Sequence, residues 1–561
     1  GVLPARIKEQ GIISEGERDG LKTAGINLAP GARRQALDEQ YLTYIALSRA
    51  SELLYLSYSA ADDEGGALMP SLVIERVKAL LPGVEQRVWP VEPNPALAGD
   101  LDFIAGADRT LSYLAAQLRE AKAGRPVNPL WWDVYRWFIR GSQREKCARV
   151  LSALFFTNRE ERLPSGTGRE LYGRTLRTSV SGMEKFIACP FAHFLSRGLR
   201  LQERTAFKLN APDLGRFFHA ALKLFGERVR SEGLEWGALK KEQIGNMAGE
   251  AVDLLAPRLQ NEILLSTARR RYLTGKLKRT VYRAALVLAE HNRRGSFRPV
   301  GLELAFGPGG DLPAVTFTLA GGAEMILTGR IDRVDAAVSD EGIYLRVIDY
   351  KSGKMTVKLA DIYHGLKMQL MAYLDVVLRH AGLLFSRYEL DYFQKALPGA
   401  VLYFRIDDPL IKTDGGVPPE AEREKKILKE LRMTGMVLSD PAVARLMDGS
   451  IKGQSDLIPV YLKSSGELAD RSAVLTREQF DLLRAYLRSK LISAGNEIMR
   501  GMIDIAPYRR ENSGACLNCP YRPVCQFDML LEGNTYRVIK DEAESVIWDL
   551  LKRSAGGDFI E

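Results

Sequence analysis

The 561-residue sequence contains no apolar run long enough to cross a bilayer, which takes about 20 consecutive apolar residues. Residues 1–15 lack the charged start and apolar block of a secretory signal. The pattern Gly-x-x-x-x-Gly-Lys-Ser/Thr is also absent, so these residues cannot cradle ATP phosphates in a loop of that kind. These absences predict a cytoplasmic protein with no membrane partner.

Cysteine is scarce, with five in the whole chain, yet three of them fall close together as Cys516, Cys519 and Cys525. Clustered cysteines in a large cytosolic protein bind metal more often than they form disulfides. With the upstream Cys189 they offer four thiolates, which suit either zinc or a [4Fe–4S] cluster, and spacing alone does not decide between the two. Cys147 is left over, and we expect an ordinary buried thiol there.

The length exceeds the roughly 100–200 residues of one ordinary domain, so we expect at least two domains. The polar, glycine-containing stretch at 164–169 is the preferred boundary. We therefore predict a first region at 1–165, a second at 166–535 and a C-terminal tail helix at 536–561. The 79 basic residues against 70 acidic ones suit a polyanionic partner without proving one.

Periodicity predicts helices at 181–197, 214–295 and 361–382, and a mostly helical section at 418–505. It predicts strands at 298–306, 314–319, 324–338, 343–350 and 400–406. Helices that flank a short mixed sheet indicate the α/β class, with helical insertions.

Two acids and a lysine stand out within two of these strands. Asp349 and Lys351 are two residues apart, so they share one face of their strand, and Asp332 lies on the neighbouring strand, where it could face them. Carboxylates can hold Mg²⁺, and a lysine beside them can orient water or offset charge on a phosphate. A surface hairpin with an ordinary Asp–Lys pair is the alternative from spacing alone.

Three further features accompany this set. His219 lies beside the apolar stripe of a predicted helix, although a lone helical histidine is usually structural. Gln369 and Tyr373 lie four residues apart on one helical face. Glu303 is an acid flanked by apolar residues in a predicted strand. Each of these could be unremarkable on its own.

The ordered set resembles the RecB-type branch of the PD-(D/E)XK nucleases. It runs from Gly215 and His219 through Gly329–Arg333 and Asp349–Lys351 to Gln369, Leu370 and Tyr373. The resemblance implies Mg²⁺ ligands at His219, Asp332 and Asp349 and a catalytic lysine at Lys351. It implies auxiliary catalytic positions at Gln369, Tyr373 and Glu303.

One distant cysteine followed by C-x2-C-x5-C looks like the iron staple of the AddB family of helicase–nuclease subunits, as do the stretches Ser179–Glu184 and Leu402–Ile411. In that family the four cysteines hold a [4Fe–4S] cluster, which implies ligands at Cys189, Cys516, Cys519 and Cys525. A cluster there would tie together segments far apart in the chain and oppose local unfolding.

The same resemblance implies an ATP-dependent deoxyribonuclease subunit that resects double-strand breaks for homologous recombination. Its partners would be an AddA-type helicase–nuclease subunit and DNA, with double-strand ends and a single strand in the nuclease channel. The segment 44–50 is similar to the last helicase motif, which implies a nucleotide contact for Arg49. We expect the chain to be a fragment of such a subunit, so that ATP would bind only a missing N-terminal region or the partner.

Two other functions remain open. The chain could be a binding module whose nuclease-like fold and iron site only scaffold DNA recognition, although the intact set of Asp332, Asp349 and Lys351 argues against this. It could also be a stand-alone exonuclease with a similar site and staple, although the helicase-like first 160 residues argue against that.

Overall fold

The computed structural model describes residues 4–5, 7, 13–61, 66–94, 99–158, 160, 163–204, 209–259, 263–388, 390, 395–411, 416, 418–511, 513–531 and 533–555. The chain divides into two compact units, residues 1–155 and 156–561, and each is described by itself. None of the helices within the described ranges has the length and apolar character needed to span a membrane. The domain limits at residues 165 and 535 stay predictions.

The first unit is helical and has a small core of its own. Its helices are α1 (Glu15–Thr23), α2 (Ala32–Ser48), α3 (Leu72–Leu80), α4 (Ala107–Lys122), α5 (Leu130–Arg140) and α6 (Arg144–Ser152). Trp131, Phe138 and Leu114 are almost completely buried in this core. The indole N–H of Trp131 donates a hydrogen bond to Asp100 Oδ2 at 3.0 Å, which satisfies its one polar group.

The second unit is built on a mixed sheet. Its described strands are β1 (Thr175–Ser179), β2 (Arg298–Phe306), β3 (Val315–Thr318), β4 (Glu324–Ser339), β5 (Gly342–Lys351), β6 (Ala396–Arg405), β7 (Thr434–Leu438) and β10 (Val474–Leu475). They follow the order β1-β4-β5-β6-β7-β10, and β2 and β3 also pair with β4. β4 and β5 form an antiparallel hairpin, whereas β5 and β6 run parallel. The strands at 298–306, 324–338 and 343–350 are thus confirmed almost to the residue.

Small strand pairs lie outside this sheet. They are β8 (Gly453–Gln454) with β9 (Tyr461–Leu462), and β11 (Tyr508–Arg510) between β12 (Ser513–Gly514) and β13 (Arg537–Val538).

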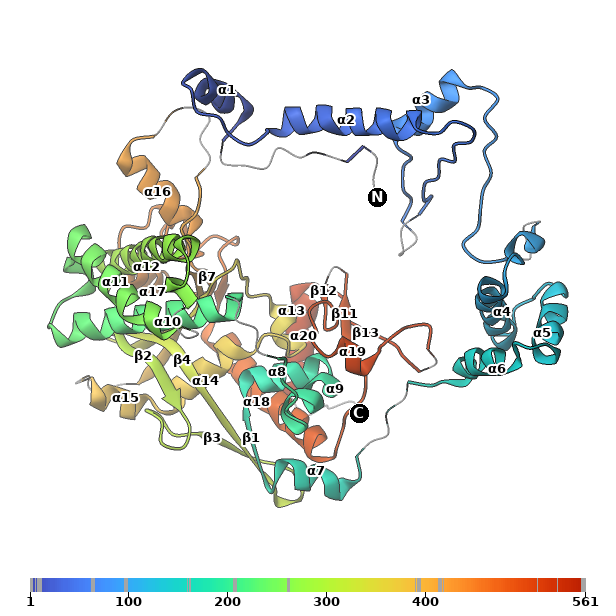
Figure 1. The fold of residues 1–561 in the computed structure, drawn as a ribbon. Coiled ribbons are helices and arrows are strands. Elements are labelled where there is room, and N and C mark those ends of the chain that lie inside the picture. Colours follow the sequence, from blue (N-terminus) through green and yellow to red (C-terminus); the bar gives the residue numbers. More distant parts are fainter. Residues whose placement is uncertain are drawn as a thin grey trace. The chain divides into compact units, whose positions relative to one another are not determined.

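Helices cover the sheet, as Figure 1 shows, and the α/β class predicted from the sequence is confirmed. α10 (Ala211–Ser231) packs on β2, and α14 (Gln369–Arg379) packs on β5 and β6. The other helices of this unit are α7 (Ser165–Tyr172), α8 (Val180–Ala188), α9 (Pro190–His193), α11 (Lys241–Leu255), α12 (Ala268–Arg294), α13 (Leu359–Tyr363), α15 (Ala381–Arg387), α16 (Glu420–Glu430), α17 (Pro441–Met447), α18 (Arg477–Met499), α19 (Arg522–Cys525) and α20 (Glu544–Ala555).

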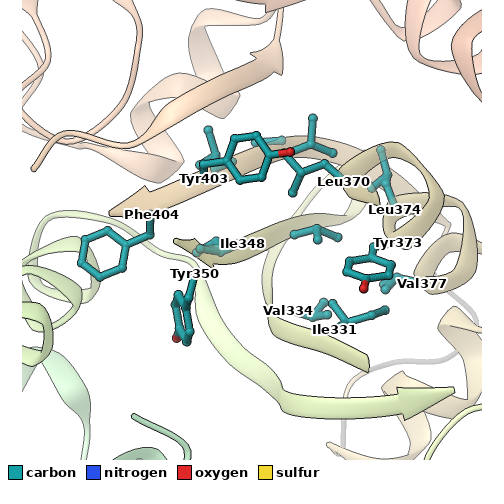
Figure 2. Packing of buried hydrophobic residues seen from close by; sticks show 14 of the residues in the cluster. Ile331, Val334, Ile348, Tyr350, Leu370, Tyr373, Leu374, Val377, Tyr403 and Phe404 are labelled. Carbon is teal, nitrogen blue, oxygen red and sulfur yellow. The ribbon is translucent and has the colours of Figure 1, made fainter. Parts of the chain in front are cut away.

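β5 runs through the middle of the core. Val347 and Ile348, whose side chains point to opposite faces of the sheet, are both completely buried, as expected of a strand covered on both faces. Figure 2 shows the two faces: Tyr403 lies toward Leu370 of α14, whereas Tyr350 and Phe404 lie together on the other side of the strands. The strand therefore has little freedom to move, which fixes the side chains at its C-terminal end.

A buried ion cluster lies within the same hairpin. Asp335 on β4 is fully buried and pairs with both Arg333 and Arg346, which are also fully buried. Their guanidinium groups stack on Trp236 and Phe297. The cluster thus connects the hairpin to the elements beside α12.

One element prediction was wrong. The section at 418–505 was predicted to be mostly helical, but it contains β7 and β10, which extend the sheet beside β6. Gly435 in β7 has a φ of 147°, and a side chain there would collide with the carbonyl of Val401. The prediction that helices dominate 214–295 is confirmed, because α10, α11 and α12 account for most of the described residues there, and α10 ends before Gly233, which has a φ of 64°.

Candidate active site

Three acidic residues lie in a row across three adjacent strands. Asp332 on β4 lies beside the pair Arg333–Ile348, which places it opposite Asp349 on β5. On its other side, the pairs Leu302–Arg333 and Leu304–Ile331 place Asp332 opposite Glu303 on β2. All three side chains are at least nine-tenths buried. The sheet register therefore gathers three carboxyl groups that are far apart in the sequence.

Asp349 and Lys351 form a close ion pair at one end of this row. Lys351 Nζ lies 2.5 Å from Asp349 Oδ2, and the lysine side chain is 28% exposed, so it can reach a bound molecule. Burial, together with the charge of Asp332, raises the pKa of Asp349 to about 7 in spite of the nearby ammonium group. The acid is therefore held close to its titration point near neutral pH.

α14 contributes the two auxiliary residues predicted from the sequence. Gln369 Oε1 accepts a hydrogen bond from Lys351 Nζ at 3.3 Å, and its Nε2 donates to the hydroxyl of Tyr373 at 2.9 Å. Burial raises the pKa of Tyr373 far above its ordinary value, so its hydroxyl stays protonated. Gln369 thus links the lysine to a fixed, buried partner.

His219 on α10 lies at the other end of the row. Its Nδ1 is 3.1 Å from Asp332 Oδ1 and 3.2 Å from Glu303 Oε1. Burial would lower the pKa of His219, but the hydrogen bonds and charges of the two acids outweigh it and raise the pKa to about 10. Glu303 itself has a φ of 51°, a strained backbone conformation that costs about 1–3 kcal/mol and is often found at functional sites.

The donors of His219, Glu303 and Asp332 fit a divalent cation. One ligand atom of each residue lies within 4.8 Å of the others. His219 Nε2 lies 3.2 Å from the carbonyl of Tyr350, which can only accept, so Nε2 carries a proton and Nδ1 faces the acids. Metal-binding histidines are commonly oriented in this way. The raised pKa of His219 means that Nδ1 also carries a proton without a cation, and a bound cation would replace that proton. Asp349 lies outside that group and is held instead by Lys351.

The backbone also holds the row in place. The amide N–H of Tyr350 donates to Asp332 Oδ2 at 2.7 Å, so this oxygen is fixed while Oδ1 faces His219. The structure thus brings together all seven residues that the sequence singled out for the nuclease site. The role of each in metal binding or catalysis stays a prediction.

Glu184 on α8 belongs to the same surroundings and was missed as a site residue. It is half-buried, and its Oε1 accepts hydrogen bonds from the backbone N–H groups of Met368 at 2.6 Å and Gln369 at 3.0 Å. Burial raises its pKa to about 7 in spite of these bonds and the charge of Lys351. No sequence spacing connects α8 with the start of α14, so only the stretch Ser179–Glu184 hinted at it.

The four predicted cluster ligands line a single pocket. Cys189 ends α8, and Cys516, Cys519 and Cys525 come from the C-terminal segment that carries α19. Burial raises the pKa of Cys189 to about 11, so without a bound cation it stays a neutral thiol. The donor set is entirely thiolate, which suits an iron–sulfur cluster or zinc.

The two remaining predicted residues lie in the first unit. Cys147 is completely buried in its core, as expected of a structural thiol. Arg49 is exposed at the C-terminal end of α2. Its proposed contact with a nucleotide stays a prediction.

Comparisons with known proteins agree with this geometry. Residues 177–526 match the description of the PD-(D/E)XK nuclease superfamily, and residues 96–153 match the fifth domain of the ATP-dependent helicase/deoxyribonuclease AddB.

Relatives whose names describe one subunit of an ATP-dependent helicase/deoxyribonuclease align along almost the whole chain. Identity is 67% for the protein of Pelotomaculum thermopropionicum and 55% for that of Desulforamulus reducens, each over 99% of this chain and 47% of the relative. The Bacillus subtilis protein is 41% identical over 100% of this chain and 47% of its own length. The chain thus spans about half the length of the curated relatives that it matches.

Proposed function

Because this chain belongs to the PD-(D/E)XK nuclease superfamily, we propose that it carries the Mg²⁺-dependent DNA exonuclease site of an AddB-type subunit. The whole enzyme would be an ATP-dependent helicase/deoxyribonuclease that resects double-strand breaks for homologous recombination. The observation that carries this proposal is the row of Glu303, Asp332 and Asp349, with His219 at one end and Lys351 at the other.

The residues of this row fit hydrolysis of a phosphodiester. In that reaction a water oxygen bonds to phosphorus while the bond to one ester oxygen breaks. The water gives up a proton, and the departing ester oxygen takes one up. The carboxylates and His219 would hold Mg²⁺, which supplies Lewis-acid stabilisation of the phosphate and lowers the pKa of water. The ammonium group of Lys351 would offset charge on a phosphoryl oxygen, and Gln369 would keep it aimed there.

The cysteine pocket supports a second cofactor in the proposal, a structural [4Fe–4S] cluster. Cys189 and the other three ligands come from opposite ends of the second unit, so a cluster would close a very long loop of chain. The likeness to AddB favours iron over zinc. Metal analysis of anaerobically purified protein would distinguish the two, because only the cluster gives iron and acid-labile sulfide.

The relatives' names, which describe one subunit of a helicase/deoxyribonuclease, support a partner subunit and a DNA substrate. We propose that this chain associates with an AddA-type helicase–nuclease, that DNA ends are the substrate, and that a single strand enters the nuclease site. ATP would bind a region outside these residues or the partner, with Arg49 as a contact of the nucleotide. The cytoplasm is the proposed location.

The test is degradation of end-labelled linear DNA with Mg²⁺ under anaerobic conditions, with and without an AddA-type subunit. We expect cleavage by the wild type and none by Asp349→Ala. Asp340→Ala is the matched control, because Asp340 is exposed at the turn between β4 and β5, away from the row of acids. A folded, iron-loaded wild type that leaves the DNA intact in both conditions would contradict the proposal and favour a DNA-binding scaffold.

A further inference from the structure

Residues 364–368, which join α13 to α14, lie between two parts of the second unit. One is the cysteine staple, formed by Cys189, Cys516, Cys519 and Cys525, and the other is the lysine of the nuclease site, Lys351. α14 begins with Gln369, which bonds directly to Lys351. Just before it, Met368 is completely buried, so the start of the helix is part of the core. Any element that fixes residues 361–369 therefore also fixes the partner of Lys351.

The helix that precedes Cys189 holds this segment through Glu184. The helix α8 carries Glu184 and ends at Cys189, one of the four cysteines. The carboxylate accepts from the first amides of α14, where the N–H groups have no partner within the helix. A negative charge at this position is further favoured by the helix dipole. Glu184 thus joins the helix of one cysteine to the helix of Gln369.

The strand that precedes Cys516 holds the same segment through Arg510. This residue of β11, which precedes Cys516, is largely buried, and its Nη1 lies 2.6 Å from Asp361 Oδ1. The carbonyl of Asp361 accepts from the amides of Leu366 at 2.8 Å and Lys367 at 3.1 Å. The loop that leads into α14 is therefore held from the C-terminal cysteine segment as well.

A third contact joins the two sides to each other. Arg537 of β13 donates through Nη2 to the carbonyls of Ile187 and Ala188 at the end of α8, the latter at 3.1 Å. Its Nε donates to the carbonyl of Ala506 at 2.8 Å. The end of α8 and the C-terminal segment thus meet beside the cysteine pocket.

From these contacts we propose that Glu184 is a positioning residue that couples the cysteine staple to the nuclease lysine. It holds the first turn of α14 in place, so that Gln369 presents its carbonyl to Lys351, and Lys351 keeps its position beside Asp349. The proposal rests on the proposed nuclease function, because it assigns Glu184 a part in the same site. Glu184 touches neither metal nor DNA in this role.

The test compares Glu184→Ala with Glu184→Gln in the anaerobically purified chain. Alanine removes the acceptor, whereas glutamine keeps a carbonyl oxygen that can accept from both amides. For Glu184→Ala we expect kcat to fall about 10- to 100-fold, as for other misplaced catalytic groups, with an unchanged Kd for DNA and unchanged iron content. Glu184→Gln should recover most of the rate, and Glu170→Ala, an exposed acid of α7, should behave as the wild type.

Hydrogen exchange provides a readout that does not depend on cleavage. The amides of Met368 and Gln369 should exchange faster in Glu184→Ala but not in Glu184→Gln. Removing the iron from the wild type with a chelator should speed exchange in α8 and in residues 361–369. Unchanged exchange there in Glu184→Ala, or a wild-type kcat in that variant, would overturn the proposal.

The two proposals can fail separately. A wild type that does not cleave DNA refutes the nuclease function, and the exchange measurement still shows whether Glu184 holds the start of α14. A wild type that cleaves, beside a Glu184→Ala variant that cleaves equally well, refutes only the role of Glu184.

Discussion

Lys351 and Asp349 lie on the same face of β5, with the lysine Nζ 2.5 Å from Asp349 Oδ2. The acid is almost completely buried, whereas the lysine is partly exposed, so the pair connects the core with the surface where a substrate would bind. This arrangement gives the lysine a fixed position and leaves part of its ammonium group free for a phosphate.

Replacing Lys351 by alanine should lower kcat by about 100- to 1000-fold, the usual cost of removing one donor aimed at developing charge. DNA affinity should change little, because one contact to the backbone is lost among many. Single-turnover cleavage of labelled DNA measures both. Lys354→Ala is the control, because Lys354 is mostly exposed and pairs with Glu430 instead. A Lys351→Ala variant that cleaves within about threefold of the wild type would argue against the assigned role.

The geometry of the acidic row predicts which substitutions weaken metal affinity most. Glu303→Gln and His219→Ala should each weaken Mg²⁺ or Mn²⁺ affinity about 10- to 100-fold, because both offer ligand atoms within the same group. Asp349→Asn should weaken it less, because its carboxylate is held by Lys351. Titration calorimetry without DNA gives the three values. The assignment of Glu303 fails if its variant binds metal as tightly as the wild type.

The position of the cysteine pocket predicts that replacing Cys516 affects iron binding, whereas replacing Cys147 does not. Cys516→Ser should lose the iron and lower the melting temperature, because Cys516 lines the pocket with Cys189. Cys147→Ser should keep its full iron content, because Cys147 is buried in the core of the other unit. Iron content and thermal unfolding are measured on both variants. Equal iron loading in the two would show that the pocket does not hold the metal.

The buried ion cluster predicts a large loss of stability in Asp335→Asn. The variant leaves Arg333 and Arg346 without their shared counter-charge, at zero exposure, which typically costs about 3–5 kcal/mol. Urea unfolding of the second unit, followed by circular dichroism, measures the change. Asp340→Asn, at an exposed turn, should stay within about 0.5 kcal/mol of the wild type. A similarly small change in Asp335→Asn would contradict the prediction.

The raised pKa of Glu184 predicts that the thermal stability of the folded chain depends on pH. Its pKa in the folded chain is about 7, above the ordinary value of 4.5, so the folded state binds this proton more tightly than the unfolded state. The protonated form of Glu184 therefore favours the folded state. This stabilisation is fully present below pH 4.5 and is lost as the pH rises toward 7. The melting temperature of the wild type should fall relative to Glu184→Gln between about pH 5 and pH 8. A constant difference, or one of opposite sign, would contradict this origin of the shift.

Several parts of the fold could be predicted from the sequence because they depend on local patterns. The β4–β5 hairpin is one example, since β5 carries an apolar run from Ile343 to Ile348 that only Arg346 interrupts, and both strands end close to the predicted positions. β7 was missed because its five residues become a strand by pairing with β6 and β10, which are contacts across the sheet that no local pattern records. Glu184 was missed for the same reason, because its partners lie on a helix far along the chain.

The sequence by itself determined the chemistry that this protein can carry: a lysine two residues after an acid, two further acids, a histidine, and four cysteines at characteristic spacing. Residue types and short spacings survive in any conformation, so they can be read without a structure. Only the tertiary structure decided that Glu303, Asp332 and Asp349 stand in one row, because that row depends on the register of three strands. It also decided that the helix of Cys189 holds the start of α14, because side-chain packing brought those two helices together.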